Sequence, residues 1–463
     1  MLKRFLGESK SNTQKIIKRV RKRDFSGNAG VVLKNSSYHL ASNLVVKISS
    51  LIFTVIMARL LMPELFGLYS LALSTILIFA AFTELGLSET LVRFVSKELS
   101  KNNVSKAKSY AKHLIKLKII ATGIVLLVLL ATAKLVSQNY YNKPIYLALI
   151  AGCFYIVFSG INVIFQSILQ ARNDFKPLLH RDLLVQLVKL TLVPFLVVFA
   201  LKFSLDNEQI LFLIISGLSF TYFVSATLLF FSPNCKNFLE GIGKKKITLN
   251  DKKNVNRFAL ASSATLLSGI FFGYIDIIML GYFVPSEFIG YYQAAFSFVS
   301  AIIPIISFST SLLPVFSGLE LDNLERLFGK ALLISSLISF ATFLALVLFS
   351  KEIILLVFGL DYLSAVNILR VFAVMIVTIP VITIYSTYFN SRGKPFIVTK
   401  ALIVSTVANV ILNYALISYF VKYGFLYALY GAAIATLISR MVYMTLLIVS
   451  KNRLNLKTSF EEK

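Results

Sequence analysis

Long apolar runs alternate with short polar segments along almost the whole chain. A helix needs about 20 apolar residues to cross a hydrocarbon core roughly 30 Å thick. Backbone groups inside a bilayer must find their hydrogen bonds within the segment, so each such run predicts a helix. Twelve runs meet this requirement, at 38–61, 68–87, 114–134, 145–169, 183–201, 209–231, 257–283, 290–314, 331–350, 364–389, 397–420 and 425–449. The pattern predicts an all-α polytopic membrane protein with about twelve transmembrane helices.

A short motif occurs twice, about half a chain apart. Glu, Gly, Tyr, Ala and Ser stand at the same five offsets in 64–74 and 287–297, and a Pro precedes each copy. A second echo agrees with the first, because Arg172 and Arg392 each end an apolar run and each have Lys-Pro shortly beyond. Internal repeats of this kind indicate duplicated structural units. The chain is therefore expected to contain two homologous halves.

The repeat predicts a domain plan. Since six helices per half is an even number, both halves enter the membrane in the same orientation, as in transporters with a central site at the repeat interface. We expect a basic tail, a six-helix lobe, a cytoplasmic linker, a second six-helix lobe and a cytoplasmic tail, at 1–37, 38–231, 232–256, 257–449 and 450–463.

Composition and charge sharpen this picture. With 57% hydrophobic and 15% charged residues, the chain is too apolar for a soluble globule. A net charge of +26 would suggest nucleic acid in a soluble protein. Here 37 of the 47 Lys and Arg residues fall in the tails and the loops predicted on their side, and 5 in the opposite loops. This positive-inside bias predicts a cytoplasmic-membrane protein with both termini in the cytoplasm and no nucleic-acid partner.

The remaining motifs exclude several classes of site. The first 37 residues are basic and lack an apolar core, so no cleavable signal peptide is expected. Within them, 15–23 has two interpretations, a helix on an anionic leaflet or a solvated tail that sets the topology. The glycines at 241–244 do not have P-loop spacing, and the three His and two Cys residues form no metal pattern. We expect no cofactor and no metal.

Charged residues inside apolar runs are the first candidates for function. Each costs about 2.5–3.5 kcal/mol at the bilayer centre, so such residues usually serve a purpose. Lys47, Arg59, Lys189, Arg370 and Arg440 are the cations in this position, and the first four are the candidates to hold a phosphate group. The alternatives are structural. Lys47 could pair with Glu84 or Glu89 and Lys189 with Asp182, while Arg59 and Arg370 could extend to the membrane surface.

Polar stripes and one acid complete the candidate site. Asn162, Gln166 and Gln170 lie on one face of a helix, where amides could bind sugar hydroxyls or simply join two helices. Asp276 is a carboxylate well inside a run of the second half. It could couple transport to a proton or cation, or it could pair with a basic residue of the other lobe. Glu84 is a candidate for the same two roles. The pairing is the favoured interpretation.

Several of these motifs resemble one known family. The sequence Arg59-Leu60-Leu61 followed by Pro63-Glu64, Phe66-Gly67 and Tyr69 resembles the opening of Wzx-type polysaccharide flippases. The same holds for Glu84-Leu85-Gly86-Leu87 with Arg93, and for Tyr274-Ile275-Asp276 with Gly281 and Gly290-Tyr291-Tyr292. This family belongs to the MOP superfamily, with the lipid II flippase MurJ and the MATE exporters.

The resemblance implies alternating access between two lobes. The expected cargo is an oligosaccharide linked to a polyprenyl diphosphate, and the expected partners are this lipid, the membrane lipids and glycan-assembly proteins. We therefore expect a net cationic cavity between the lobes, with Lys47 as the leading diphosphate contact. Arg59 lies twelve residues further along the helix and about 120° around it, so the two predict a relay of contacts rather than one clamp.

Two rival classes fit the sequence less well. A MATE-like drug:cation antiporter would need carboxylates in its cavity, whereas the first helix offers Lys47 and Arg59. A membrane glycosyltransferase or polymerase would carry its catalytic groups in a large outer loop, and the outer loops predicted here are short. The expected protein is a transporter and not an enzyme.

Overall fold

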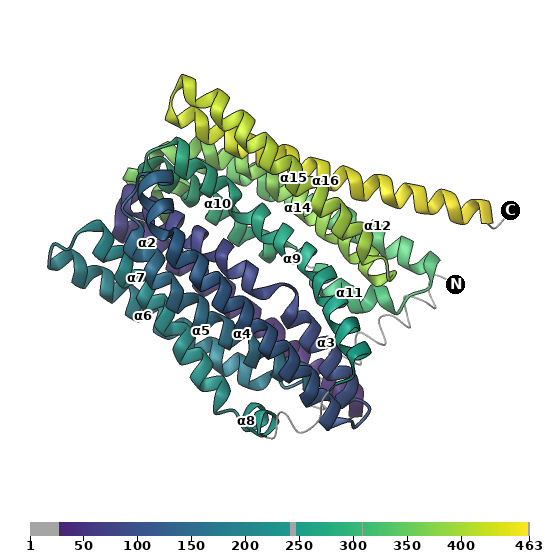
Figure 1. Ribbon diagram of the computed structural model, residues 1–463. Helices are drawn as coiled ribbons and strands as arrows, with labels where there is room; N and C mark the ends of the chain where they lie inside the picture. The colour runs from purple at the N-terminus through teal and green to yellow at the C-terminus, as the bar shows by residue number, and fades with distance from the viewer. Residues whose placement is uncertain (1–26, 241–246, 308, 462–463) are drawn as a thin grey trace.

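The computed structural model describes residues 27–240, 247–307 and 309–461, and within these ranges it is helical without strands. The tail segment 15–23 lies outside them. Figure 1 shows two sets of long helices that follow the two halves of the chain. The first half contains α2 (Gly27–Glu84), α3 (Leu87–Leu99), α4 (Val104–Lys134), the π-helical segment η1 (Leu135–Tyr141), α5 (Tyr146–Ala171), α6 (Lys176–Lys202), α7 (Asn207–Phe230) and α8 (Pro233–Leu239).

The second half repeats the succession of long helices. It contains α9 (Leu249–Phe283), α10 (Ser286–Ile306), α11 (Ser309–Ser317), α12 (Leu321–Leu348), α13 (Ser350–Val357), η2 (Leu360–Ala365), α14 (Val366–Ser391), α15 (Pro395–Phe420), η3 (Val421–Tyr423) and α16 (Phe425–Glu461). The expected linker, 232–256, thus holds α8 and the first turns of α9. The superposition of the two halves stays a prediction.

Helix α2 is a hairpin of two membrane spans. Its backbone leaves the helical region at Met62, where φ is 57° and ψ is 168°, and Pro63 follows. Proline has no N–H to continue the helical ladder, and it forces the preceding residue out of the α region. The first arm, 27–61, and the second arm, 63–84, therefore correspond to the first two apolar runs. The α9–α10 hairpin turns in the same way, through the extended residues Val284 and Pro285.

The predicted number of spans agrees with the structure. Ten helices in the described ranges are long and apolar enough to cross a membrane, and the first of them, Ala41–Leu99, contains both arms of α2. The expected run at 290–314 corresponds to α10 and α11, which are separated by an extended residue at Ser307. Together these account for about twelve spans.

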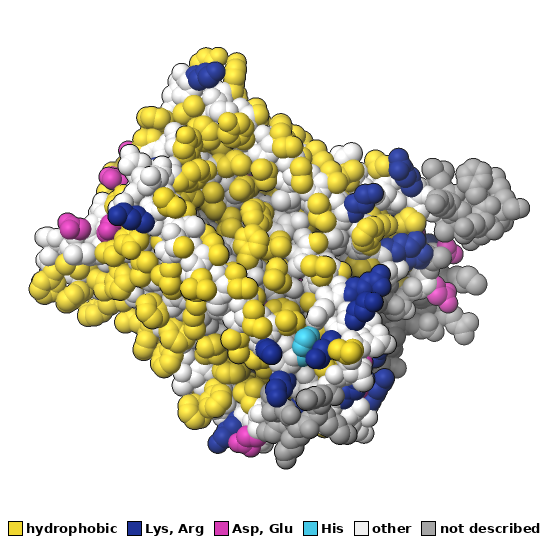
Figure 2. All heavy atoms as spheres, viewed as in Figure 1, with side chains coloured by type: hydrophobic (Ala, Val, Ile, Leu, Met, Phe, Trp, Pro, Cys, Tyr) yellow, Lys and Arg dark blue, Asp and Glu magenta, His cyan; other side chains and the backbone are white. Residues whose placement is uncertain are grey.

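The two ends of the bundle differ in charge. One end holds α3, α8, α11 and the last turns of α16 (Figure 1), and Lys and Arg side chains gather there in Figure 2. We call it the basic end. The other holds Met62 and the α9–α10 turn, and we call it the kink end. Between them the surface is apolar, and side chains such as Leu127, Leu187 and Phe195 are more than 60% exposed. An apolar belt between polar ends is what a bilayer requires.

Helix α9 links the two halves. Near the basic end, Val255 and Ala259 pack against Leu91 and Leu114 of α3 and α4. Towards the kink end, Ile277 and Leu280 join the main core, which contains residues of both halves. The halves therefore share one helix and one core rather than forming separate domains.

Candidate functional site

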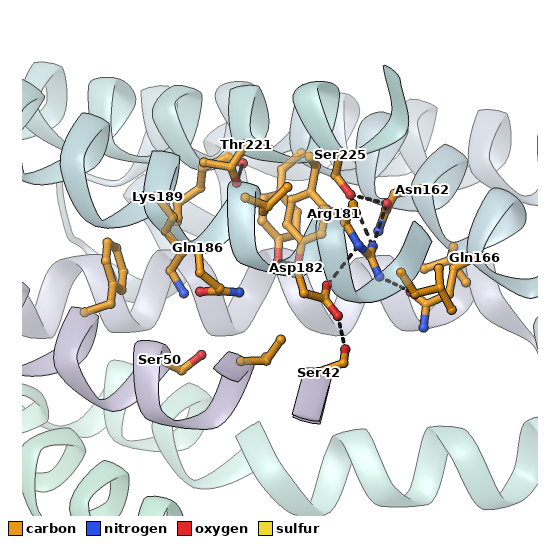
Figure 3. A pocket seen from close by; sticks show the side chains of 18 of the residues that line it. Ser42, Ser50, Asn162, Gln166, Arg181, Asp182, Gln186, Lys189, Thr221 and Ser225 are labelled. Carbon is orange, nitrogen blue, oxygen red and sulfur yellow. Dashed lines mark hydrogen bonds and ion pairs between the residues drawn. The ribbon is translucent and has the colours of Figure 1, made fainter. Parts of the chain in front are cut away.

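A polar cavity of about 680 Å³ lies among α2, α5, α6 and α7 (Figure 3). Every lining residue except Tyr274 of α9 belongs to the first half. The expected cavity between the lobes is thus found mainly inside one of them. Its volume falls within the range of small-molecule sites. Its polar groups form two clusters, one around Arg181 and one around Lys189, which Figure 3 shows at opposite ends.

The Arg181 cluster is saturated by internal contacts. Its Nε lies 2.9 Å from the Asp182 carboxylate, and its Nη1 donates to Asn162 at 3.0 Å and to Ser225 at 3.2 Å. Its Nη2 donates to Gln166 at 3.3 Å, and Ser42 of α2 donates to Asp182. A buried charge is tolerated when it is paired and hydrogen-bonded in this way. The cluster ties four helices together and leaves no charge uncompensated.

The Lys189 cluster is different, because its groups lack internal partners. The Lys189 ammonium lies 4.3 Å from the centre of the Phe53 ring, a cation–π contact. In the described ranges it forms no ion pair or hydrogen bond. Gln186, one turn away, has a buried Oε1 with no partner among the described residues. Since Arg181 and Asp182 cancel, Lys189 gives the cavity its net positive charge.

Helix geometry places Lys189 deep in the membrane. Helix α6 begins at Lys176, at the basic end. At 1.5 Å per residue, Arg181 lies about 8 Å and Lys189 about 20 Å along the helix. The cavity therefore runs from a neutralised ion pair near the basic end to an uncompensated cation near mid-membrane.

Tyrosines line the cavity towards the kink end. Tyr69, Tyr155, Tyr222 and Tyr274 contribute rings from α2, α5, α7 and α9. The Tyr155 hydroxyl donates to that of Tyr222 at 3.4 Å, and their rings are 5.0 Å apart and T-shaped. Aromatic faces with polar hydroxyls suit a ligand that has both C–H and O–H groups.

Lys47 does not line this cavity. It is exposed on α2, next to Val46, which does line it. Of its two possible partners, Glu84 pairs with the buried Lys118 and accepts a hydrogen bond from Ser88 at 2.5 Å, and Glu89 forms no ion pair with Lys47 among the described residues. Lys189 is likewise not paired with Asp182. Both structural pairings expected from the sequence are wrong, and both lysines are left without a carboxylate among the described residues.

Arg59 and Arg370 also lie outside the cavity. Arg59 donates to the carbonyl oxygens of Leu356 and Val357, the latter at 2.8 Å, at the C-terminal end of α13. A cation is favourable at that end of a helix. Arg370 donates to Ser350 at 2.7 Å and to Asn367 at 3.0 Å. Both guanidinium groups thus have partners outside this cavity, and the relay from Lys47 to Arg59 stays a prediction.

The amide stripe is divided between two environments. Asn162, Gln166 and Gln170 all line the cavity, but Asn162 and Gln166 accept from Arg181, whereas no such bond is formed by Gln170 in the described ranges. Sequence reasoning missed Arg181, which was counted among the cytoplasmic charges that set the topology. The signal was available, because a stripe of amide acceptors on one helix requires a donor from its neighbour.

Asp276 is buried in the second half, and its partners come from the same half. Tyr292 and Asn413 each donate to it at 2.7 Å, and Thr436 donates at 2.5 Å. Arg440 lies close enough to interact electrostatically and stacks 4.0 Å over Phe272. The expected partner from the other lobe is therefore not what the structure shows.

No metal cluster is evident in the part of the chain that the structure describes, where no three His, Cys, Asp or Glu side chains converge. The Asp276 cluster nevertheless has spare acceptors. The Oδ1 atoms of Asn409 and Asn413 are buried without a described partner. Such an oxygen-rich cluster has the chemistry to hold a proton or a hard cation.

Comparison with known proteins gives a family and a fold. The model of the family described as "Polysaccharide biosynthesis protein" matches residues 32–320. A probable low-salt glycan biosynthesis flippase of Haloferax volcanii is 25% identical over 201 residues, which cover 42% of this chain and 41% of that protein. The match thus spans less than half of that relative. An uncharacterized membrane protein of Methanocaldococcus jannaschii is 22% identical, over 91% of this chain and 84% of its own.

Solved structures agree on the fold. The lipid II flippase MurJ in an inward closed conformation gives a TM-score of 0.68 at 16% identity, covering 89% of this chain and 87% of that one. An inward-facing multidrug resistance MATE transporter of the MOP superfamily gives 0.60 at 15% identity, covering 91% and 95%. At such identities the likeness concerns the fold alone.

Proposed function

The chain belongs to the family of polysaccharide biosynthesis proteins, and we propose that it is a flippase for a lipid-linked oligosaccharide. The polar head crosses the cytoplasmic membrane by alternating access, while the lipid tail stays in the bilayer. The proposal is supported by the glycan flippase among its relatives and by the fold it shares with a lipid II flippase. It includes no chemical conversion of the cargo.

The observation that carries the proposal is the uncompensated Lys189 in a cavity lined with amides and hydroxyls. A lipid-linked oligosaccharide combines a phosphate anion with many hydroxyl groups. The anion gains most at a cation that no carboxylate already neutralises. Arg181 does not meet this condition, because Asp182 pairs with it. Lys189 therefore holds the phosphate, and Gln186, Gln170 and the tyrosines face the sugars.

Lys47 has a different part in this proposal. It is exposed on the first arm of α2, beside the apolar and exposed Leu44 and Ile48, and Val46 next to it lines the cavity. On this face a phosphate head group could contact the Lys47 ammonium while the apolar lipid tail contacts Leu44 and Ile48. Lys47 is accordingly an entry contact, and Lys189 is the contact inside.

The orientation follows from charge. We place the basic end and both termini in the cytoplasm, in line with the 37-to-5 distribution of Lys and Arg.

Asp276 then serves the energy coupling that export requires. Its burial among neutral donors makes its charge sensitive to a bound proton or cation.

Export of glycan tests the proposal. The chain is expressed in cells that lack their own flippase, and the surface glycan is measured together with membrane abundance. Lys189→Ala should lower export by at least about tenfold, because the phosphate loses its charge partner. Lys189→Arg should retain a measurable part of it. Lys422→Ala removes an exposed lysine near the kink end and serves as the matched control.

Two results would contradict the proposal. Full export by Lys189→Ala at normal abundance would remove Lys189 from the site. Efflux of a cationic drug without any glycan export by the parent protein would favour the MATE-like antiporter instead. A change in the mass of the glycan after passage would point to an enzyme.

A further inference from the structure

The two copies of the repeated motif meet at the kink end. Helices α2 and α10 pack together there, with Gly67 against Gly290. A Cβ added to Gly67 would lie 2.8 Å from the Gly290 nitrogen and closer still to the Ser286 carbonyl oxygen. A Cβ added to Gly290 would lie 2.8 Å from the Pro63 carbonyl carbon and closer still to its oxygen. The two backbones are thus in direct contact, which only glycine allows.

The contact is reciprocal, as a twofold relation between the repeats would require. Each glycine faces the turn that precedes the other copy, Gly67 facing Ser286 and Gly290 facing Pro63. The sequence motif is therefore used twice in one place. Its recurrence has a physical reason, because each copy supplies half of a single close contact.

Three further side chains form hydrogen bonds that cross between the halves. The Tyr362 hydroxyl donates to the Ala58 carbonyl oxygen at 2.8 Å. The Lys143 ammonium donates to the Gly281 carbonyl oxygen at 2.7 Å. Arg59 contributes its two bonds to the end of α13. All four acceptors are backbone oxygens, so these bonds form only when whole helices are in register.

The contact lies between the cavity and the kink end. Tyr69, which lines the cavity, follows Gly67 by two residues, and Pro63 and Met62 lie on the other side of Gly67. The backbone of Met62 has a positive φ and an extended ψ, a combination that residues other than glycine rarely adopt. This kink directly precedes the close contact. Separation of α2 from α10 would open a path beside it.

We propose that the Gly67–Gly290 contact is the outer gate of the transporter. In the closed state the two backbones seal the cavity from the kink end, and the four bonds to carbonyl oxygens hold the halves in register. In the open state α2 and α10 part at these glycines. The inference needs two access states but no particular substrate, so it stands apart from the choice of cargo.

Cysteine labelling tests the gate. Cys153 and Cys235 are first replaced by Ser, and Leu73→Cys is introduced as a reporter inside the cavity. A membrane-impermeant thiol reagent is added to the outside of intact cells. Gly67→Val or Gly290→Val should raise the labelling rate at least about tenfold, because the added side chain excludes the closed state. Tyr362→Phe removes one bond only and should raise the rate by a smaller factor.

Matched controls separate gating from damage. Gly123→Val and Gly329→Val also place a valine in a helix, but at positions where an added Cβ meets no atom within 4 Å. Both should leave the reporter as protected as in the parent. If Gly67→Val fails to reach the membrane, Gly67→Ala takes its place in the test, because the alanine Cβ already lies too close to the Ser286 carbonyl oxygen.

The outcomes distinguish this inference from the proposed function. A reporter that stays protected in folded Gly67→Ala and Gly290→Ala variants overturns the gate. Faster labelling in the gate variants, combined with full glycan export by Lys189→Ala, would keep the gate and overturn the substrate site. Faster labelling in the control variants as well would overturn the assignment of the gate to these two glycines.

Discussion

Both halves of the molecule bury an acid near an arginine, yet they do so in different ways. In the first half, Arg181 and Asp182 are neighbours on one helix, form an ion pair at 2.9 Å and line a cavity. In the second half, Asp276 and Arg440 come from α9 and α16, and three neutral donors occupy the carboxylate. No pocket described in the structure includes Asp276.

The difference indicates a division of labour. A cavity keeps water and polar groups that a ligand can replace, so the first half suits binding of a head group. The buried Asp276 network does not line the cavity of the first half, and its charge balance changes when one proton or cation binds. The second half therefore suits control of the conformational state. On the function proposed above, the first half would bind the cargo and the second half would serve the coupling.

The largest effect is expected at Arg181. Arg181→Met leaves Asp182 buried without its partner, which typically costs about 3 kcal/mol or more. The double variant Arg181→Met with Asp182→Leu removes both charges and should recover most of that loss. Thermal unfolding of the purified protein in detergent measures both. A single variant as stable as the parent would show that the pair does not hold the four helices together, and the contrast with Asp276 would lose its basis.

The sequence predicted the spans well because each one depends on local composition. The Met62–Pro63 turn was visible as a proline between two apolar runs, and the repeat was visible because both glycines are needed at one contact. Partner choice was not visible. Glu84 pairs with Lys118 and not with Lys47, and only the packing of α4 against α2 reveals that partner.

The place of the cavity also required tertiary information. Two six-helix lobes suggest a site at their interface, whereas the structure lines the cavity from four helices of one lobe. Arg181 illustrates the reason. Its position near the start of a span is typical of a topology-setting charge, and only the packing of α5 and α7 against α6 shows that its terminal nitrogens donate to Asn162, Ser225 and Gln166.

A second prediction concerns Asp276. Asp276→Asn keeps the size of the side chain but removes its charge and its response to a proton or cation. Export of glycan should fall by about tenfold or more, while membrane abundance stays near that of the parent, since Asn can still accept hydrogen bonds. Asn390→Asp, at the exposed end of α14, is a control that changes the charge elsewhere in the same half. Unchanged export by Asp276→Asn would exclude a coupling role.

The smallest effect is expected at Lys47. An exposed lysine that meets the head group only during entry contributes a surface electrostatic interaction, worth about 1 kcal/mol or less. Lys47→Ala should therefore reduce export by roughly threefold to fivefold, and less at high ionic strength, because salt screens exposed charges. Lys47→Arg should restore it. The loss should add to that of Lys189→Ala in the double variant, since the two contacts act at successive steps and lie on different helices. A loss as large as that of Lys189→Ala would place Lys47 inside the site, and the cavity of the first half would then be only part of it.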